Sequence, residues 1–127
     1  MSYLLDTHAL IWYFENSDDI PESIASLIDN PVHHKFISVV SLWEIAIKIN
    51  MGKLNMRLSL DELLDVISNS ELAVIPIEGS HLKGLSKLPY IHKDPFDRLL
   101  ISTALMEDLT IITIDENIQK YDVLWVW

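Results

Sequence analysis

Four acidic residues stand where short apolar segments pass into amphipathic ones, a pattern that can support metal chemistry. Asp6 and Asp115 each directly follow an apolar segment, whereas Glu44 and Asp97 lie early in the amphipathic segment that comes next. Taken alone, each acid is explained about twice as well by helix capping as by chemistry, because carboxylates are favoured at helix starts. Ser41 and Glu44, for example, have the spacing of a capping box.

Capping does not require four acids to meet at one place, whereas a divalent cation does. Two carboxylates about 4 Å apart repel each other by about 4 kcal/mol at an effective dielectric constant of about 20. Mg²⁺ or Mn²⁺ would relieve this repulsion, since both ions prefer oxygen ligands and keep bound water for chemistry. A metal-bound water and an oriented phosphate are what the hydrolysis of a phosphate ester needs. The four acids are therefore candidate catalytic residues and metal ligands, provided that the fold brings them together.

The apolar patterns of the chain predict the elements that position these acids. Uninterrupted apolar runs are typical of strands buried on both faces of a parallel sheet, and they occupy residues 3–5, 36–39, 72–75, 110–114 and 123–125. Amphipathic spacing predicts helices over residues 8–14, 21–28, 42–50, 59–69, 80–87 and 94–107. The prediction is an α/β fold in one domain spanning residues 1–127, a three-layer α/β/α sandwich around a central parallel sheet of four to five strands. Ligands bind beyond the carboxyl ends of the strands in such sheets, where the four acids are expected.

Composition excludes several classes of protein. The 127 residues include no cysteine, which rules out disulfide frameworks, thiolate metal sites and cysteine nucleophiles. The three glycines stand apart, so there is no glycine-rich nucleotide-binding loop. The sequence shows neither a signal peptide nor an apolar run long enough to cross a bilayer, and we expect a cytoplasmic protein with no membrane association. The formal net charge of −10 by itself argues against a nucleic-acid partner.

Other residues near the acids have two explanations each. Asp94 precedes Pro95, and N-capping is favoured over metal binding by about two to one. Arg98 is equally suited to binding a phosphate through its forked guanidinium and to pairing with a neighbouring acid. The five histidines show no metal-ligand spacing. The four tryptophans are expected in the core or at subunit contacts, with Trp12 and Trp43 on apolar helix faces.

Several segments, spread over most of the chain, have a specific combination of residues. They are residues 4–8, 10–12, 38–45, 92–101, 113–115 and 121–123. Each segment alone is weak evidence, but the DPFDR stretch at 94–98 is specific when it is combined with the early aspartate and the mid-chain glutamate. As a set, they resemble the PIN-domain ribonucleases of the VapC toxin type.

The resemblance implies a set of metal-binding and catalytic acids. Position by position, Asp6, Glu44 and Asp97 match the three acids of the family, and Asp115 matches a fourth, more variable one. Asp6 and Asp97 would bind the metal most directly, and Glu44 and Asp115 would act through water or position the attacking water. Three residues match hydroxyl positions that orient the carboxylates, namely Thr7, Ser41 and Thr113.

The resemblance also implies an activity and partners. It implies Mg²⁺- or Mn²⁺-dependent endonucleolytic cleavage of RNA, which leaves 5′-phosphate and 3′-hydroxyl ends. It further implies a small antitoxin of the VapB type that covers the site, and we expect the protein to form a homodimer. The identity of the RNA does not follow from the sequence.

Two alternatives remain open. A catalytically silent module with the PIN fold would keep the acids for stability and partner binding. A structure-specific DNA nuclease of the same broad fold would need helical arches for which 127 residues leave no room. A dehalogenase-like phosphatase is excluded, because it needs an Asp-x-Asp motif and this chain has Asp6-Thr7-His8.

The distribution of charge changes the inference drawn from the total. Segments 33–57 and 80–98 contain eight of the nine Lys and Arg residues and only three of the nineteen acids. The rest of the chain carries one base and sixteen acids. We therefore predict a basic rim around an acidic metal centre, with Lys48, Lys53 and Arg57 contacting RNA and the surplus acids on outlying helices.

Overall fold

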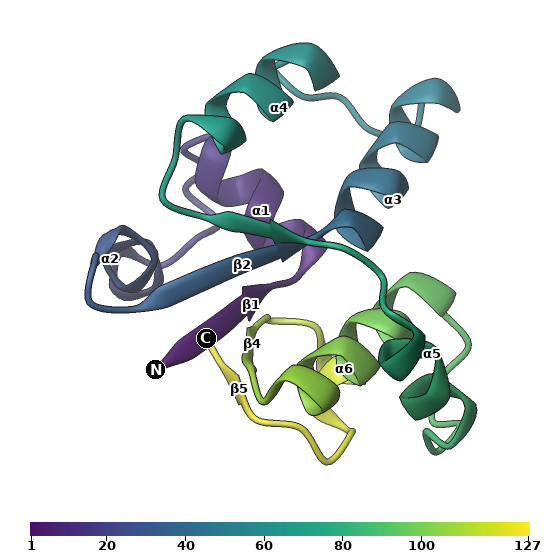
Figure 1. Ribbon diagram of the computed structural model, residues 1–127. Coiled ribbons are helices and arrows are strands. Elements are labelled where there is room, and N and C mark those ends of the chain that lie inside the picture. Colours follow the sequence, from purple (N-terminus) through teal and green to yellow (C-terminus); the bar gives the residue numbers. More distant parts are fainter.

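The sheet at the centre of the computed structural model, which describes all of residues 1–127, has five parallel strands (Figure 1). In chain order the strands are β1 (Ser2–Leu5), β2 (His34–Ser38), β3 (Ala73–Ile75), β4 (Thr110–Ile112) and β5 (Trp125–Val126). Their spatial order is β3-β2-β1-β4-β5, which places β1 in the middle. Because every neighbouring pair is parallel, all five carboxyl ends lie at the same edge of the sheet.

Helices cover both faces of this sheet. They are α1 (Thr7–Phe14), α2 (Glu22–Asp29), α3 (Val39–Asn50), α4 (Leu60–Ser68), α5 (Gly79–Ser86), α6 (Pro95–Glu107) and α7 (Glu116–Gln119). Helices α1, α2 and α4 lie on one face, and α5 and α6 lie on the other (Figure 1). The predicted three-layer α/β/α sandwich with a parallel sheet is confirmed. None of these helices has the length and apolarity needed to span a membrane.

Alternate residues of the strands supply two separate hydrophobic cores. Tyr3 and Leu5 of β1 pack with α1, α2 and α4, whereas Leu4 packs with α6 and α7. The same alternation separates Ile112 from Ile111 on β4. Successive side chains of a strand point to opposite faces, so an apolar run without interruption fills both cores.

The connections between strands change direction at the carboxyl ends of β1 and β4. After β1 the chain passes through α1 and α2 to β2, on one side of β1 in the sheet. After β3 it passes through α5 and α6 to β4, on the other side of β1. In open parallel sheets, such a reversal of strand order is where ligands bind.

Several boundaries differ from those predicted. The strand predicted to reach residue 39 ends at Ser38, whose hydroxyl accepts a hydrogen bond from the backbone N–H of Val40 at 3.1 Å and so starts α3 three residues early. The last strand lies at 125–126 rather than 123–125, and β4 ends at Ile112. The short helix α7 was not among the predicted elements. The predicted stop of α3 is confirmed, since Gly52 follows its end with a φ of 69°.

Candidate active site

Asp6 occupies the centre of the carboxyl edge, directly after β1. Its side chain caps α1, because Oδ1 accepts the backbone N–H of Ala9 at 2.8 Å. Its other oxygen, Oδ2, accepts the hydroxyl of Thr113, which follows β4. The residue is only 3% exposed, and burial raises the pKa of its carboxyl group despite both hydrogen bonds. Asp6 thus serves as a helix cap and still presents a desolvated carboxylate.

Asp97 enters the same edge from α6. Asp94 caps this helix by accepting the backbone N–H of Asp97 at 3.0 Å, as N-capping predicted. Burial is the main cause that raises the pKa of Asp97 to about 6, and the carboxylates of Asp94 and Asp115 raise it further. A carboxyl group with such a pKa is only partly stabilised as an anion by its surroundings.

Asp115 connects the other two aspartates electrostatically. Its Oδ1 caps α7 by accepting the N–H groups of Asn117 at 2.8 Å and Ile118 at 3.3 Å. Its negative charge raises the pKa of both Asp6 and Asp97. The fold therefore places Asp115, which follows β4, where it repels both Asp6 at the end of β1 and Asp97 at the start of α6.

The carboxylate of Glu44 contacts Thr7 and Lys48 and does not form the predicted capping box with Ser41. The capping-box interpretation is wrong, because Ser38 rather than Ser41 starts α3 and Glu44 lies one turn further into the helix. Its buried carboxylate, 4% exposed, accepts the hydroxyl of Thr7 at 2.8 Å and forms an ion pair with Lys48 at 2.6 Å. The hydrogen bond to Glu44 raises the pKa of Lys48, and the carboxylates of Asp94 and Asp97 add to that effect.

Two of the three hydroxyl groups that the resemblance assigned to orienting the carboxylates contact a carboxylate directly, and the third contacts one of these hydroxyls. Thr113 donates to Asp6, and Thr7 donates to Glu44. Ser41 is fully buried and shares a hydrogen bond of 3.0 Å with the Thr7 hydroxyl. These contacts fix the two carboxylates that come from different layers of the sandwich.

A contact that the sequence analysis missed involves His92. Its Nε2 lies 3.1 Å from Asp97 Oδ2, and its Nδ1 lies 2.8 Å from the hydroxyl of Tyr121. The sequence offered a weak indication, because His92 precedes Asp97 by five residues within the same specific segment. Tyr121 lies in a different segment, and its proximity depends on the fold.

Of the two explanations offered for Arg98, pairing with a neighbouring acid is wrong, and binding of a phosphate stays a prediction. The guanidinium is buried and forms no ion pair. It donates to the Pro89 carbonyl at 2.9 Å, to the Tyr121 hydroxyl at 2.9 Å and to the Leu88 carbonyl at 3.4 Å. Its role in this structure is to hold the segment before α6 in place.

The basic rim is smaller than predicted. Lys48 lies within the acidic edge, and Lys53 is exposed just beyond the end of α3. Lys35, which the charge count included, is buried near the opposite end of β2 and donates to the Asn30 carbonyl at 2.8 Å. Arg57 binds Glu15 at the end of α1.

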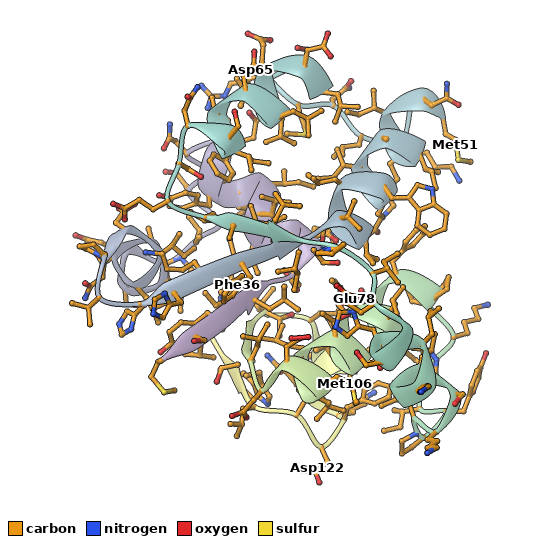
Figure 2. All side chains as sticks on the ribbon, in the orientation of Figure 1. Phe36, Met51, Asp65, Glu78, Met106 and Asp122 are labelled. Carbon is orange, nitrogen blue, oxygen red and sulfur yellow. The ribbon has the colours of Figure 1, made fainter.

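The predicted acids do lie on outlying helices, as Asp65 on α4 shows (Figure 2).

The tryptophans divide between the core and the surface. Trp12 and Trp127 are partly buried and pack edge to face, with ring centres 5.8 Å apart. Trp43 does not lie on the buried face of its helix: it is 55% exposed and packs against Phe96 with ring centres 5.2 Å apart. This aromatic pair stands directly beside Glu44 and Asp97 in the sequence.

The donor chemistry of the acidic edge fits a divalent cation bound largely through water. No group of three or more His, Asp or Glu side chains is arranged closely enough to coordinate one ion directly. Mg²⁺, however, commonly binds through one or two carboxylates and keeps several water ligands. Buried Asp6 and partly buried Asp97 supply oxygen ligands that lack a lysine or arginine partner. Asp115, whose charge raises the pKa of both Asp6 and Asp97, would be the third acid around the cation.

The acidic edge is open rather than enclosed. None of the four cavities includes Asp6, Glu44, Asp97 or Asp115; the largest, about 480 Å³, is lined by residues of α1, α2 and the loop between them. Small-molecule sites usually lie in well-formed cavities. An open acidic edge is better matched to a long substrate that passes over the surface.

Comparisons with known proteins give the family. A model of the PIN domain matches residues 3–124, so the chain belongs to the PIN domain family, whose members are typically nucleases. No significant match is found among curated protein sequences.

Solved structures show the same fold. The chain is similar to one in "VapBC2 from Rickettsia felis bound to a DNA fragment from their promoter", with 19% identity over 99% of this chain and 98% of that chain and a TM-score of 0.73. It is also similar to chains of FitAcB from Neisseria gonorrhoeae (16% identity, 98% and 96% covered, TM-score 0.71) and of VapBC-1 from nontypeable Haemophilus influenzae (20% identity, 99% and 97% covered, TM-score 0.70). At these identities the likeness establishes the architecture.

Proposed function

We propose that this PIN-domain protein is an endoribonuclease that depends on Mg²⁺ or Mn²⁺. The observation that supports this function best is that buried Asp6 and partly buried Asp97 lie at one edge of the sheet, where Asp115 repels both and neither has a lysine or arginine partner. Hydrogen bonds offset only part of the cost of desolvating a carboxylate, and a bound cation would offset more of it. A cation-binding function explains why the fold keeps them together.

Each acid has a role in the proposed reaction. A divalent cation bound there would lower the pKa of a coordinated water and stabilise charge that develops on the phosphate. Asp6 and Asp97 would hold this cation, and Asp115 would position the attacking water. Glu44 would act through water, with Thr7 fixing the direction of its carboxylate. Lys48, which forms an ion pair with Glu44, is placed to attract a backbone phosphate.

The proposed substrate is RNA, and the proposed products carry 5′-phosphate and 3′-hydroxyl ends. The test is incubation of the protein with RNA and with DNA of matched sequence, with Mn²⁺ or with a chelator. We expect internal cleavage of RNA with Mn²⁺ only, and sequencing of the ends to show 5′-phosphates. Preferential cleavage of DNA would favour the alternative nuclease, and no cleavage of either would favour a silent module.

The proposed biological context is a toxin–antitoxin pair. The similar solved structures include VapBC complexes and a toxin–antitoxin complex from Klebsiella pneumoniae, which supports a VapB-like antitoxin and a cytoplasmic location for this protein. The exposed Trp43–Phe96 pair beside the site supports a protein contact there, and we propose a homodimer. Co-purification with the product of a small adjacent reading frame, which inhibits cleavage when added back, tests the antitoxin.

A further inference from the structure

A continuous set of hydrogen bonds runs from the interior of the protein to Asp97. Arg98 Nη1 donates to the hydroxyl oxygen of Tyr121 at 2.9 Å. That oxygen also accepts the backbone N–H of His92 at 3.2 Å and lies 2.8 Å from His92 Nδ1. The opposite ring nitrogen, Nε2, lies 3.1 Å from Asp97 Oδ2. The side chains of Tyr121 and His92 thus connect the buried Arg98 guanidinium to a carboxylate of the proposed site.

The chemistry of a phenol group determines the direction of every bond in this set. A tyrosine hydroxyl has one proton to donate and two lone pairs that accept. The Arg98 guanidinium and the His92 backbone N–H occupy both lone pairs of Tyr121. The Tyr121 proton must therefore point at His92 Nδ1, which accepts it. An imidazole whose Nδ1 accepts carries its proton on Nε2. His92 then donates from Nε2 to Asp97 Oδ2.

The surroundings prevent the ring of His92 from taking another orientation. Arg98 is anchored by the carbonyls of Pro89 and Leu88, and its guanidinium lies 4.6 Å from the ring centre of Tyr90. Tyr121 is 5% exposed and packs edge to face on His92 with ring centres 5.4 Å apart. A rotated or flipped ring would leave the Tyr121 proton and the Asp97 carboxylate without their partners.

This arrangement excludes two other roles for His92. A general base needs a free lone pair directed at the proton that it removes. The one lone pair of the His92 ring is taken up by Tyr121, and Nε2 carries a proton. For the same reasons His92 cannot coordinate a metal while these contacts hold. The remaining role is to hold Asp97.

We propose that His92 is a positioning residue, which Tyr121 and Arg98 lock in the Nε2–H form so that it fixes Asp97 Oδ2 and leaves Oδ1 for a cation or its bound water. This inference rests on the proposed function, since it assigns Asp97 to cation binding. No hydrogen bond in the structure engages Asp97 Oδ1. Groups that orient ligands in this way typically contribute 10- to 100-fold to metal affinity or activity.

The first test reads the proton on His92 directly. Long-range ¹H–¹⁵N NMR correlation on the metal-free, ¹⁵N-labelled protein distinguishes the two neutral tautomers and the charged ring. We expect a protonated Nε2 and an unprotonated Nδ1 at neutral pH, and loss of this single form in Tyr121→Phe. A protonated Nδ1 in the unaltered protein would overturn the proposal. This result does not depend on nuclease activity, so it stands or fails separately from the proposed function.

The second test separates positioning from a merely structural contact. Glutamine can place an amide donor near the position of Nε2, whereas asparagine can place one only near Nδ1. We expect His92→Asn to weaken Mn²⁺ binding, measured by electron paramagnetic resonance of the free ion, by about 10- to 100-fold, and His92→Gln to restore most of it. His34→Asn, at the exposed start of β2, is the matched control and should bind Mn²⁺ normally.

Three outcomes of this titration decide the point. Equal losses in the Gln and Asn variants, in parallel with their melting temperatures, would show that His92 only supports the fold and would overturn the positioning role. Mn²⁺ affinity that does not change in His92→Asn would overturn it as well. Mn²⁺ binding by the unaltered protein, weakened as expected in His92→Asn, together with no cleavage of RNA by the unaltered protein would contradict the proposed function while leaving the role of His92 intact.

Discussion

The hydroxyl of Thr113 donates to Oδ2 of Asp6, although the two residues are 107 positions apart in the chain. This contact joins the carboxyl ends of β1 and β4, the two strands at which the chain reverses its direction across the sheet. It partly offsets the effect of burial, which raises the pKa of Asp6. A residue that follows one strand therefore lowers the pKa of a carboxylate at the end of the neighbouring strand, against the larger effect of burial.

Replacement of Thr113 by valine tests this relationship. The variant keeps the shape of the side chain but removes the donor, so the pKa of Asp6 should rise further. We expect the free energy of unfolding at pH 7 to fall by about 1.5–3 kcal/mol, a typical contribution of a hydrogen bond to a charged group. Urea denaturation measures it. Thr103→Val is the matched control, because the equally buried Thr103 hydroxyl donates only to the Leu99 carbonyl within α6. An equal loss in both variants would contradict a special role for the pair.

Asp97 should make the metal-free protein less stable as pH rises. Its pKa is about 6 in the folded protein and near 3.8 when unfolded, so the unfolded chain releases this proton first. Between about pH 4 and 6 the folded state binds more protons, and the free energy of unfolding therefore falls as pH increases. Asp97→Asn should remove this slope and raise the stability of the metal-free protein at pH 7 by about 1–3 kcal/mol. An Asp97→Asn variant that is less stable than the parent at pH 7 would show that the ionised carboxylate does not destabilise the folded protein.

Mn²⁺ should stabilise the protein through the same carboxylates. A ligand that binds only the folded state at 100 times its Kd contributes about 2.7 kcal/mol. We expect the melting temperature to rise by several degrees with Mn²⁺ in the unaltered protein and to stay constant in an Asp6→Asn/Asp97→Asn double variant. Asp61→Asn/Asp65→Asn, on the exposed face of α4, is the control. Equal shifts in the two double variants would indicate nonspecific binding of the ion.

Lys48 and Lys53 should account for part of the salt dependence of RNA binding. Lysines that neutralise a phosphate release counterions, so removing one reduces the slope of log K against log salt concentration by about one. We expect this reduction in Lys48→Met and in Lys53→Met, each combined with Asp6→Asn so that the RNA is not cleaved during the binding measurement. Arg57→Met should change the slope less, because Arg57 contacts Glu15 at the end of α1 opposite to Asp6 and so lies away from the acidic edge. An unchanged slope in both lysine variants would contradict the remaining basic rim.

Local patterns in the sequence predicted the layers of the fold and the approximate ends of its strands. Buried parallel strands are recognisable because they must fill two cores at once, as Leu4 and Leu5 do. Asp6 and Asp115 could be placed because Asp6 directly follows β1 and Asp115 comes three residues after the end of β4. The start of α3 was predicted incorrectly, since Val39 and Val40 are β-branched and favour a strand until the hydroxyl of Ser38 caps the helix.

Contacts between distant segments limited the prediction of the site. The pair of Glu44 and Lys48 has the spacing of a helical ion pair and could have been found from sequence. The position of Arg98 could not, because its partner Tyr121 comes from beyond β4 and α7. The same tertiary contact gives His92 its orientation, so a histidine without ligand spacing turned out to touch the proposed site.

The most direct measurement is the Mn²⁺-dependent rate of RNA cleavage by Asp6→Asn, with circular dichroism to check the fold. Asparagine can still cap α1 through its carbonyl oxygen, so the variant should fold, whereas it lacks the negative charge that would hold the cation. The account predicts a fall in rate of at least about 100-fold, comparable with losing a principal electrostatic group of an active site. Cleavage at the unaltered rate by a correctly folded Asp6→Asn protein would contradict it.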